Sequence, residues 1–169
     1  MRLSWAAAKP PTAALPDGIR IRELSMADEV ALGGLMWDAF SGTVEGEYAD
    51  PSDAGMDAAE TLAGKRGPVV WCASLAAELD SVIVAAVVVV RDNAHGYLPL
   101  LAFAVTHPAR QRRGIGSRLI EESIARLASS GVNELHLAVV RGNPAFGLYQ
   151  RLGFQVVARQ EDLTRAPPA

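Results

Sequence analysis

The sequence contains few residues of the kinds that bind metals or form disulfides. It has one cysteine, Cys72, and three histidines in 169 residues. One cysteine excludes an internal disulfide framework, and His95, His107 and His136 lack the spacing of a metal site, so we expect no metal. Because Cys72 lies in an apolar run, we predict a small buried side chain, which is a poor nucleophile.

Long hydrophobic runs and an excess of positive charge are also absent. The longest apolar run, 82–90, is well short of the ~18 residues that suggest a membrane span, so we expect no membrane partner. The formal net charge is −3, which argues against nucleic-acid binding, because that depends on broad basic surfaces. The N-terminus lacks a continuous apolar core of signal-peptide length, and we therefore expect a cytoplasmic protein.

Length and composition are typical of one domain with a sizeable core, since half of the residues are hydrophobic. Residues 1–17 are rich in alanine and proline without a period, and we interpret them as a flexible extension. We predict a single domain at 18–162 and a C-terminal tail at 163–169. The sequence leaves the oligomeric state open, with a homodimer as the commonest assembly.

Hydrophobic periodicity predicts a sheet covered by helices, an α/β or α+β fold. Strands are expected at 19–23, 69–76, 82–91, 97–106, 134–140 and 154–159, and helices at about 25–41, 52–63, 115–130 and 143–152. Short connections favour an antiparallel meander over 69–106. The helical crossover that follows makes 97–106 and 134–140 parallel. The sheet is therefore predicted to be mixed, mostly antiparallel, and flanked by about four helices.

A basic loop with two glycines, Q-R-R-G-I-G at 111–116, joins a predicted strand to an amphipathic helix. The first N–H groups of a helix have no intrahelical acceptor and lie at the positive end of its dipole, so phosphate oxygens can bind there. Gly114 and Gly116 would let the backbone approach a phosphate. The loop has neither the Gly-Lys-Ser/Thr of a P-loop nor a G-x-G-x-x-G fingerprint. By itself it also fits an ordinary basic loop before a surface helix.

The loop resembles the Gln/Arg-x-x-Gly-x-Gly/Ala signature of the GNAT superfamily, the acetyl-CoA-dependent N-acetyltransferases. A second segment, N-P-A-F-G-L-Y-Q-R-L-G-F at 143–154, is similar to that family's Asn-x-Ala-x-x-Leu-Tyr…Leu-Gly-Phe segment. The spacing between the two segments also matches the family. The resemblance covers roughly residues 97–160. It implies a GNAT-like sheet in which the two parallel strands splay apart, with acetyl-CoA as cosubstrate.

The resemblance also implies where the cofactor would bind. The CoA pyrophosphate would lie on the loop at 111–116. The pantetheine arm would run along the strand at 103–105, whose backbone N–H would stabilise the oxyanion of the reacting thioester. The implied cofactor-binding residues are Phe103, Ala104, Val105, Gln111, Arg112, Arg113, Gly114, Ile115, Gly116, Ser117, Asn143 and Tyr149. The pattern of the residues alone indicates only a buried strand at 103–105 and, at Asn143 with Pro144, a helix N-cap.

Tyr149 is the predicted general acid. The pKa of a phenol, ~10, lies above the ~8.5 of a thiol, so Tyr149 can stay protonated and donate to a departing CoA thiolate. The resemblance implies that role. The alternative is a core tyrosine, because Ala145 and Leu152 share its face of the predicted helix.

The general base is less well defined by the sequence. Glu47 is our prediction, since it lies in the acidic loop 41–53 that would border the acceptor site. A water relay or Glu78 is the alternative. The acidity of the loop also favours a cationic acceptor through electrostatic steering.

The sequence thus predicts an acyltransferase that moves the acetyl group of acetyl-CoA to a primary amine of a small molecule or peptide. The amine would attack directly in a ternary complex. Two alternatives stay open, namely a CoA-binding sensor or regulatory module without transfer, and an acyltransferase for a longer acyl-CoA or a protein amine. Nothing in the sequence selects the acceptor, because fold-level resemblance fixes the donor better than the acceptor.

Overall fold

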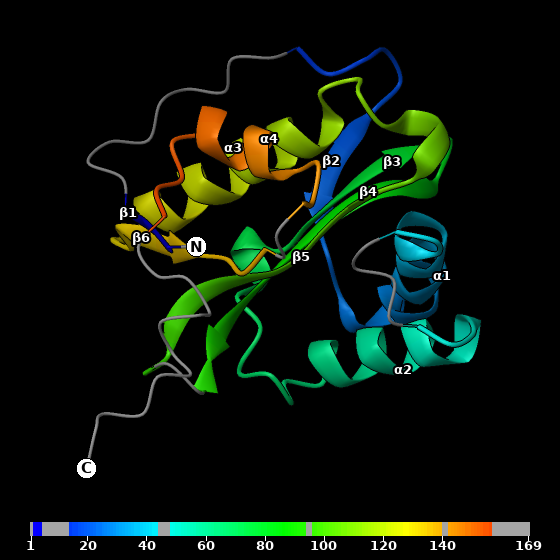
Figure 1. The fold of residues 1–169 in the computed structure, drawn as a ribbon, viewed down its shortest axis with the longest axis horizontal. Helices are drawn as coiled ribbons and strands as arrows, with labels where there is room; N and C mark the ends of the chain where they lie inside the picture. Colours follow the sequence, from blue (N-terminus) through cyan, green and yellow to red (C-terminus); the bar gives the residue numbers. More distant parts are fainter. Residues whose placement is uncertain (1, 5–13, 44–47, 94–95, 140–141, 157–169) are drawn as a thin grey trace.

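The computed structural model describes residues 2–4, 14–43, 48–93, 96–139 and 142–156. In this part of the chain, six strands form one sheet with the order β1-β6-β5-β4-β3-β2 (Figure 1). The strands are β1 (Arg2–Ser4), β2 (Arg20–Glu23), β3 (Leu75–Leu79), β4 (Val82–Asp92), β5 (Leu98–Thr106) and β6 (Glu134–His136). The α-helices are α1 (Glu29–Phe40), α2 (Pro51–Leu62), α3 (Ile115–Ser129) and α4 (Phe146–Arg151). One-turn 3₁₀ helices lie at η1 (Met26–Asp28), η2 (Trp71–Ala73) and η4 (Pro108–Arg110).

The helices cover both faces of the sheet and define two cores. Helices α3 and α4 lie on one face, whereas α1 and α2 lie on the other (Figure 1). Leu119 and Ile120 of α3 are fully buried in the first core, and Leu32 and Met36 of α1 are fully buried in the second. This confirms the predicted class of a sheet between helices. None of the described helices is long and apolar enough to cross a membrane.

The strand directions agree with the prediction. Strands β2, β3, β4 and β5 pair antiparallel in sequence order, and β6 runs parallel to β5 after the crossover through α3. The described residues give this parallel contact only one pair, Leu100 with His136. Residues 137–139 then continue outside the strand. The predicted separation of the two parallel strands is therefore present, and the sheet is mixed and mostly antiparallel.

The predicted strand at 69–76 is wrong in its extent. Val69 pairs with Val90 and the Val70 N–H donates to the Val89 carbonyl, but the chain then turns through η2 before β3 begins at Leu75. The Ser74 hydroxyl fills the gap, because it donates to Val89 O (3.2 Å) and accepts from Val89 N (3.0 Å). The Ser74 side chain thus makes the contacts with Val89 that a continuous strand would make with its backbone.

Four further features differ from the expectations. Cys72 lies on η2 and is exposed, not buried as predicted, because the turn carries it out of the strand. Strand β6 ends at His136, and α4 begins at Phe146, since the residues after Asn143 first form a turn. The structure adds β1, which pairs antiparallel with β6, within the stretch 1–17. The final strand predicted at 154–159 lies largely outside the described residues, and the domain bounds at 18–162 stay a prediction.

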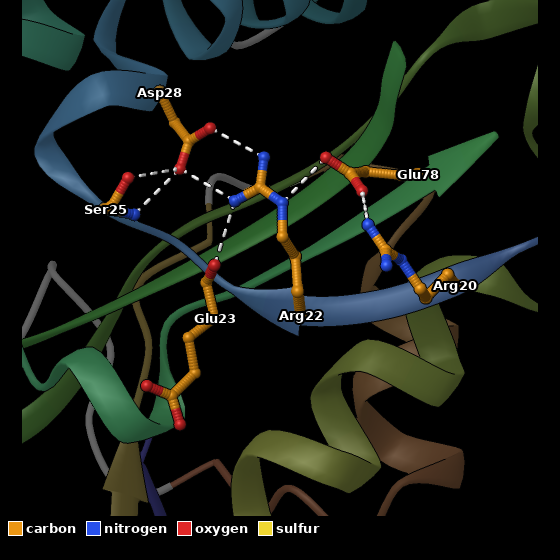
Figure 2. A network of polar contacts seen from close by, with 6 residues as sticks. All are labelled: Arg20, Arg22, Glu23, Ser25, Asp28 and Glu78. Atoms are coloured by element: carbon orange, nitrogen blue, oxygen red, sulfur yellow. Dashed lines mark hydrogen bonds and ion pairs between the residues drawn. The ribbon is translucent and has the colours of Figure 1, made fainter. Parts of the chain in front are cut away.

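An ion-pair network centred on Arg22 joins α1 to the edge of the sheet (Figure 2). Its guanidinium donates to both oxygens of Asp28 at 2.7 and 2.8 Å, and its Nε donates to Glu78 Oε1 at 2.7 Å. Arg20 donates to the other Glu78 oxygen at 3.0 Å. Asp28 also accepts from Ser25 N at 2.8 Å. The start of α1 is therefore tied to β2 and β3 by charge-assisted hydrogen bonds.

The same strand edge is linked to α3 on the opposite face. Arg22 donates to the Glu23 carbonyl, and the Glu23 side chain pairs with Arg126 Nη1 at 3.0 Å. Arg126 Nε pairs with Glu122 at 3.1 Å. Polar contacts thus run around β2 from the first turn before α1 to the middle of α3.

The network makes stability depend on acidic pH. Hydrogen bonds from Arg22 are the main reason that the pKa values of Asp28 and Glu78 lie below their usual range. The unfolded chain, with pKa values of ~3.9 and ~4.3, therefore binds more protons at low pH, so the stabilisation is present above about pH 5 and is lost as pH falls through the lower folded values. Urea unfolding between about pH 7 and 3 should show this loss.

Asp28→Asn should flatten that pH dependence, because the amide cannot titrate. The matched control is Glu29→Gln, which removes a nearby carboxylate with no ion pair among the described residues and should change the slope less than Asp28→Asn. Equal slopes for the wild type and Asp28→Asn would contradict the assignment.

Alanine substitution at two glycines of α1 should change the free energy of unfolding in opposite directions. A Cβ on Gly33 would lie 2.7 Å from the Gly55 Cα of α2, so Gly33→Ala should force the helices apart and lower the free energy of unfolding by ~1–3 kcal/mol. A Cβ on Gly34 meets nothing within 4 Å, so Gly34→Ala should raise it by ~0.5–1 kcal/mol. The midpoints of urea unfolding, compared at an unchanged dependence of the free energy on urea, measure both changes. A Gly33→Ala variant more stable than the wild type would contradict the close contact between the helices.

Candidate active site

A β-bulge lies in the middle of β5. Val88 and Val89 of β4 pair with Phe103 and Leu101, so Ala102 is an extra residue on β5 with no opposite partner in β4. In a regular strand, residues two apart share a face. Here Leu101 lies in the α3-side core and Phe103 lies in the α1/α2-side core. The bulge therefore changes which side chains face each layer, as bulges commonly do near functional sites.

The edge of β5 that faces β6 is open beyond the bulge. The described residues contain one parallel pair, at Leu100, and no strand partner on this side for 102–106. Unpaired N–H and C=O groups of a strand need hydrogen-bond partners, so this edge can bind an extended chain of polar groups. The predicted residues Phe103, Ala104 and Val105 all lie on this segment.

The loop after β5 is held close to the end of that strand. His107 N donates to Val84 O at 2.9 Å, and Gln111 Nε2 donates to the Thr106 carbonyl at 3.1 Å. Arg112 and Gly114 both have positive φ, 60° and 79°. These left-handed residues turn the chain sharply into α3. Gln111, predicted to contact the cofactor, has its side chain engaged in this internal bond.

The first turn of α3 has free backbone donors. Gly114 is the N-cap and provides no side-chain cap. Within the described part of the chain, no backbone acceptor is recorded for the N–H groups of Ile115, Gly116 and Ser117. A Cβ on Gly116 would lie 3.1 Å from Thr106 Oγ1, so this turn sits directly against the end of β5. The open strand edge and the uncapped helix start thus adjoin, which suits an anion at the helix followed by an extended polar chain.

The loop arginines leave positive charge available at this helix start. Arg112 and Arg113 are exposed, and together with Arg110 they form no ion pair with any described residue. Arg118 is different, because its Nη1 lies 3.3 Å from Glu122 Oε2. Three of the four arginines near the loop can therefore contribute charge to an anion.

The second segment predicted from the sequence lies on the α3 side of the sheet. Tyr149 is 8% exposed and belongs to the same core as Leu101, with Ala104 packed against that core. Its ring contacts Phe154, with the centroids 5.6 Å apart. Asn143 Oδ1 accepts from Ala145 N at 2.7 Å and caps the turn before α4. The structure thus brings Tyr149 to the face of β5 opposite Phe103, and a core role and a chemical role remain compatible.

The opposite side of β5 is lined by α1, α2 and the segments beside them. Trp37 and Tyr48 pack against the core that contains Phe103. Glu47, the predicted base, lies outside the described residues. Glu78, its alternative, accepts from two arginines and has a lowered pKa through the Arg22 hydrogen bond, which makes it a poor base.

Sequence reasoning missed two features of this region. Arg66 lies over the ring of Phe103, with its guanidinium carbon 5.4 Å from the ring centroid. The bulge at Ala102 is the other. Neither carries a signal in the sequence, because Arg66 follows α2 in a polar stretch and 97–106 is almost continuously apolar, without a glycine to mark a bulge.

The chain is similar to known acetyltransferases. A family model described as an acetyltransferase (GNAT) domain matches residues 70–156. Among solved structures, a GNAT family acetyltransferase from Brucella melitensis in complex with acetyl-CoA is 23% identical, with a TM-score of 0.61, and the match covers 82% of this chain and 83% of that one.

Two further structures share the fold. The PaiA N-acetyltransferase from Thermoplasma acidophilum, in complex with coenzyme A, is 21% identical with a TM-score of 0.65, over 82% of this chain and 90% of that one. The ribosomal-protein-S18-alanine N-acetyltransferase from Escherichia coli is 22% identical with a TM-score of 0.64, over 83% and 79%. At these identities, the likeness establishes the architecture rather than the acceptor.

Gln111→Ala should loosen the loop. Loss of the hydrogen bond to the Thr106 carbonyl costs ~1 kcal/mol locally, so hydrogen exchange of the loop amides at 109–114 should accelerate about fivefold. Exchange followed by mass spectrometry measures this. Arg113→Gln is the matched control, because Arg113 forms no recorded side-chain bond with the described residues. Unchanged exchange in Gln111→Ala would show that the side chain does not fix the loop.

Proposed function

Because the chain belongs to the GNAT acetyltransferase family, we propose that it transfers the acetyl group of acetyl-CoA to a primary amine by direct attack in a ternary complex. The observation that supports this most directly is the junction of two unpaired backbone surfaces. The open edge of β5 meets the uncapped start of α3 at the contact between Thr106 and Gly116. Acetyl-CoA has the matching chemistry, an extended amide-containing arm that ends in a pyrophosphate.

The proposed cofactor contacts follow from this geometry. The pyrophosphate would accept from the amides of Gly114, Gly116 and their neighbours, with Arg112 and Arg113 neutralising its charge. Gln111 would act mainly by fixing the loop, since its side chain already donates to Thr106. The amide groups of pantetheine would pair with the β5 edge. The cofactor-binding residues that we propose are Phe103, Ala104, Val105, Gln111, Arg112, Arg113, Gly114, Ile115, Gly116, Ser117, Asn143 and Tyr149.

In the proposed chemistry, the amine attacks from one face of β5 and the general acid acts from the other. The neutral amine attacks the thioester carbonyl carbon from the α1/α2 side and forms the C–N bond. A β5 backbone N–H stabilises the oxyanion. The C–S bond then breaks, and Tyr149, on the α3 side, gives its proton to the departing thiolate. Glu47 is our proposed base for the amine, because it immediately precedes Tyr48, which packs on the α1/α2 side.

A cationic acceptor suits the charge of the α1/α2 side. The sequence has no lysine, arginine or histidine between Glu23 and Gly64, and this stretch forms α1, α2 and the loop between them. Lys65 and Arg66, which follow α2, are paired with Glu60 and Asp57. One similar solved structure is in complex with a bisubstrate analogue, CoA-S-monomethyl-acetylneamine. Another is a ribosomal-protein-S18-alanine N-acetyltransferase. We therefore propose a small-molecule or peptide amine as the acceptor, drawn in by electrostatic steering.

Release of CoA thiol in the presence of amines tests the proposed function. Wild-type protein with acetyl-CoA should release thiol with at least one of ethanolamine, putrescine, lysine amide and a short unmodified peptide. Tyr149→Phe should lower kcat by about 100-fold or more with little change in acetyl-CoA affinity, because the proton donor is lost while the ring stays.

The matched control is Tyr97→Phe, which removes the hydroxyl of an exposed tyrosine and should leave kcat unchanged. An unaltered kcat in Tyr149→Phe would reduce Tyr149 to a packing residue. Acetyl-CoA binding without thiol release for any amine would instead support a sensor module.

A further inference from the structure

The ring of Phe103 is held in place from the α2 side. Arg66 lies over it at 5.4 Å, within range of a cation–π contact. Arg66, whose side chain is half exposed, donates from Nη2 to Asp57 Oδ1 at 2.7 Å and from Nε to Thr61 Oγ1 at 3.1 Å. Phe103 is 9% exposed and belongs to the α1/α2-side core. The ring therefore cannot turn towards α2 unless Arg66 leaves its two partners.

The contacts that hold Arg66 extend through Asp57 to Tyr48, between α1 and α2. The second oxygen of Asp57 accepts from the Tyr48 hydroxyl at 2.9 Å. Tyr48 is the first described residue after 44–47, and its ring lies 6.3 Å from that of Phe40 at the end of α1. Both carboxylate oxygens of Asp57 are thus engaged, and a continuous set of contacts joins Tyr48 to Phe103.

Phe103 also lies on the segment of β5 along which the thioester is proposed to run. It follows the bulge residue Ala102, on the segment of β5 that has no strand partner on its β6 side among the described residues. The proposed leaving sulfur lies towards Tyr149 on the α3 side, and the amine arrives from the α1/α2 side. The acyl carbon would lie between them beside β5, and an acyl chain that extends towards the α1/α2 side would meet the side chain of Phe103.

We propose that Phe103 determines which acyl group the enzyme accepts, and that Arg66 is a positioning residue that keeps the ring in place. The proposal rests on the proposed function, because it takes the thioester to lie along β5. An acetyl group ends at its methyl and fits beside the ring. A butanoyl group carries two further carbons, which would overlap the ring unless the ring and Arg66 moved together. The substrate class is therefore acetyl-CoA, with longer acyl-CoAs excluded.

Binding of two acyl-CoAs tests this without knowledge of the acceptor. Calorimetry should show that the wild type binds acetyl-CoA about tenfold or more tightly than butanoyl-CoA, the discrimination that one or two extra carbons produce in a closed apolar site. Phe103→Ala should bring the two dissociation constants within about twofold, by tighter binding of butanoyl-CoA. Arg66→Gln should shift the ratio in the same direction but less, because the ring stays and gains freedom to move.

Two controls separate selectivity from loss of stability. Leu32→Ala truncates a fully buried residue of the same core on α1 and should lower stability without changing the ratio. Lys65→Gln removes the charge next to Arg66, which pairs with Glu60, and should also leave the ratio unchanged. If Phe103→Ala does not give a folded protein by circular dichroism, Phe103→Leu, which also lacks the ring, replaces it with the same expected direction.

The outcomes separate this inference from the proposed function. If the wild type binds neither acyl-CoA, the proposed function fails. Equal wild-type affinity for the two acyl-CoAs, or an unchanged ratio in a folded Phe103 variant, overturns only the role of Phe103. An unchanged ratio in Arg66→Gln overturns the positioning role of Arg66. A ratio that changes equally in Leu32→Ala would show that any core truncation relaxes selectivity, and it would overturn the proposal as well.

Discussion

The loss of strand pairing on one side of β5 is the constraint on which the rest of the structure depends. After Leu100 pairs with His136, the described residues provide no further strand on that side. Buried backbone polar groups need partners, so an edge left open in the middle of a sheet is costly unless a ligand or water completes it. The bulge at Ala102 and the uncapped start of α3 both lie beside this edge. In the proposed function, an extended substrate that ends in an anion would satisfy both sets of groups at once.

The two helical layers cover opposite faces of the sheet beside this edge and differ in charge. Helix α3 is fully buried along one face and places its first turn against Thr106. Helix α1 is tied to the opposite end of the sheet by Arg22, whose pKa is raised mainly by its hydrogen bonds to Asp28. The stretch that forms α1 and α2 has no basic residue, whereas the loop before α3 is rich in arginine. In the proposed function, the anionic cofactor and a cationic acceptor would approach from different sides and meet at β5.

Local sequence signals predicted the parts of the structure that depend on local physics. The apolar period of α3, its glycine cap at Gly131 and the short hairpin connections all appear where expected, because each depends on residues close in sequence. The bulge at Ala102 could not be predicted, since it is defined by register against β4. The same holds for η2, where Ser74 bonds to Val89 across the sheet. Motif resemblance supplied the candidate site, but the position of Arg66 over Phe103 required the fold.

Calorimetric titration of the purified protein with acetyl-CoA tests the central claim most directly. The account predicts saturable binding by the wild type and loss of that binding in Gly114→Trp, because an indole at the left-handed N-cap of α3 would both strain the turn and fill the approach to the helix amides. Circular dichroism would verify that the variant retains its fold. Absence of wild-type binding, or equal binding by the folded variant, would contradict the assignment of the β5 edge and the α3 start as the acetyl-CoA site.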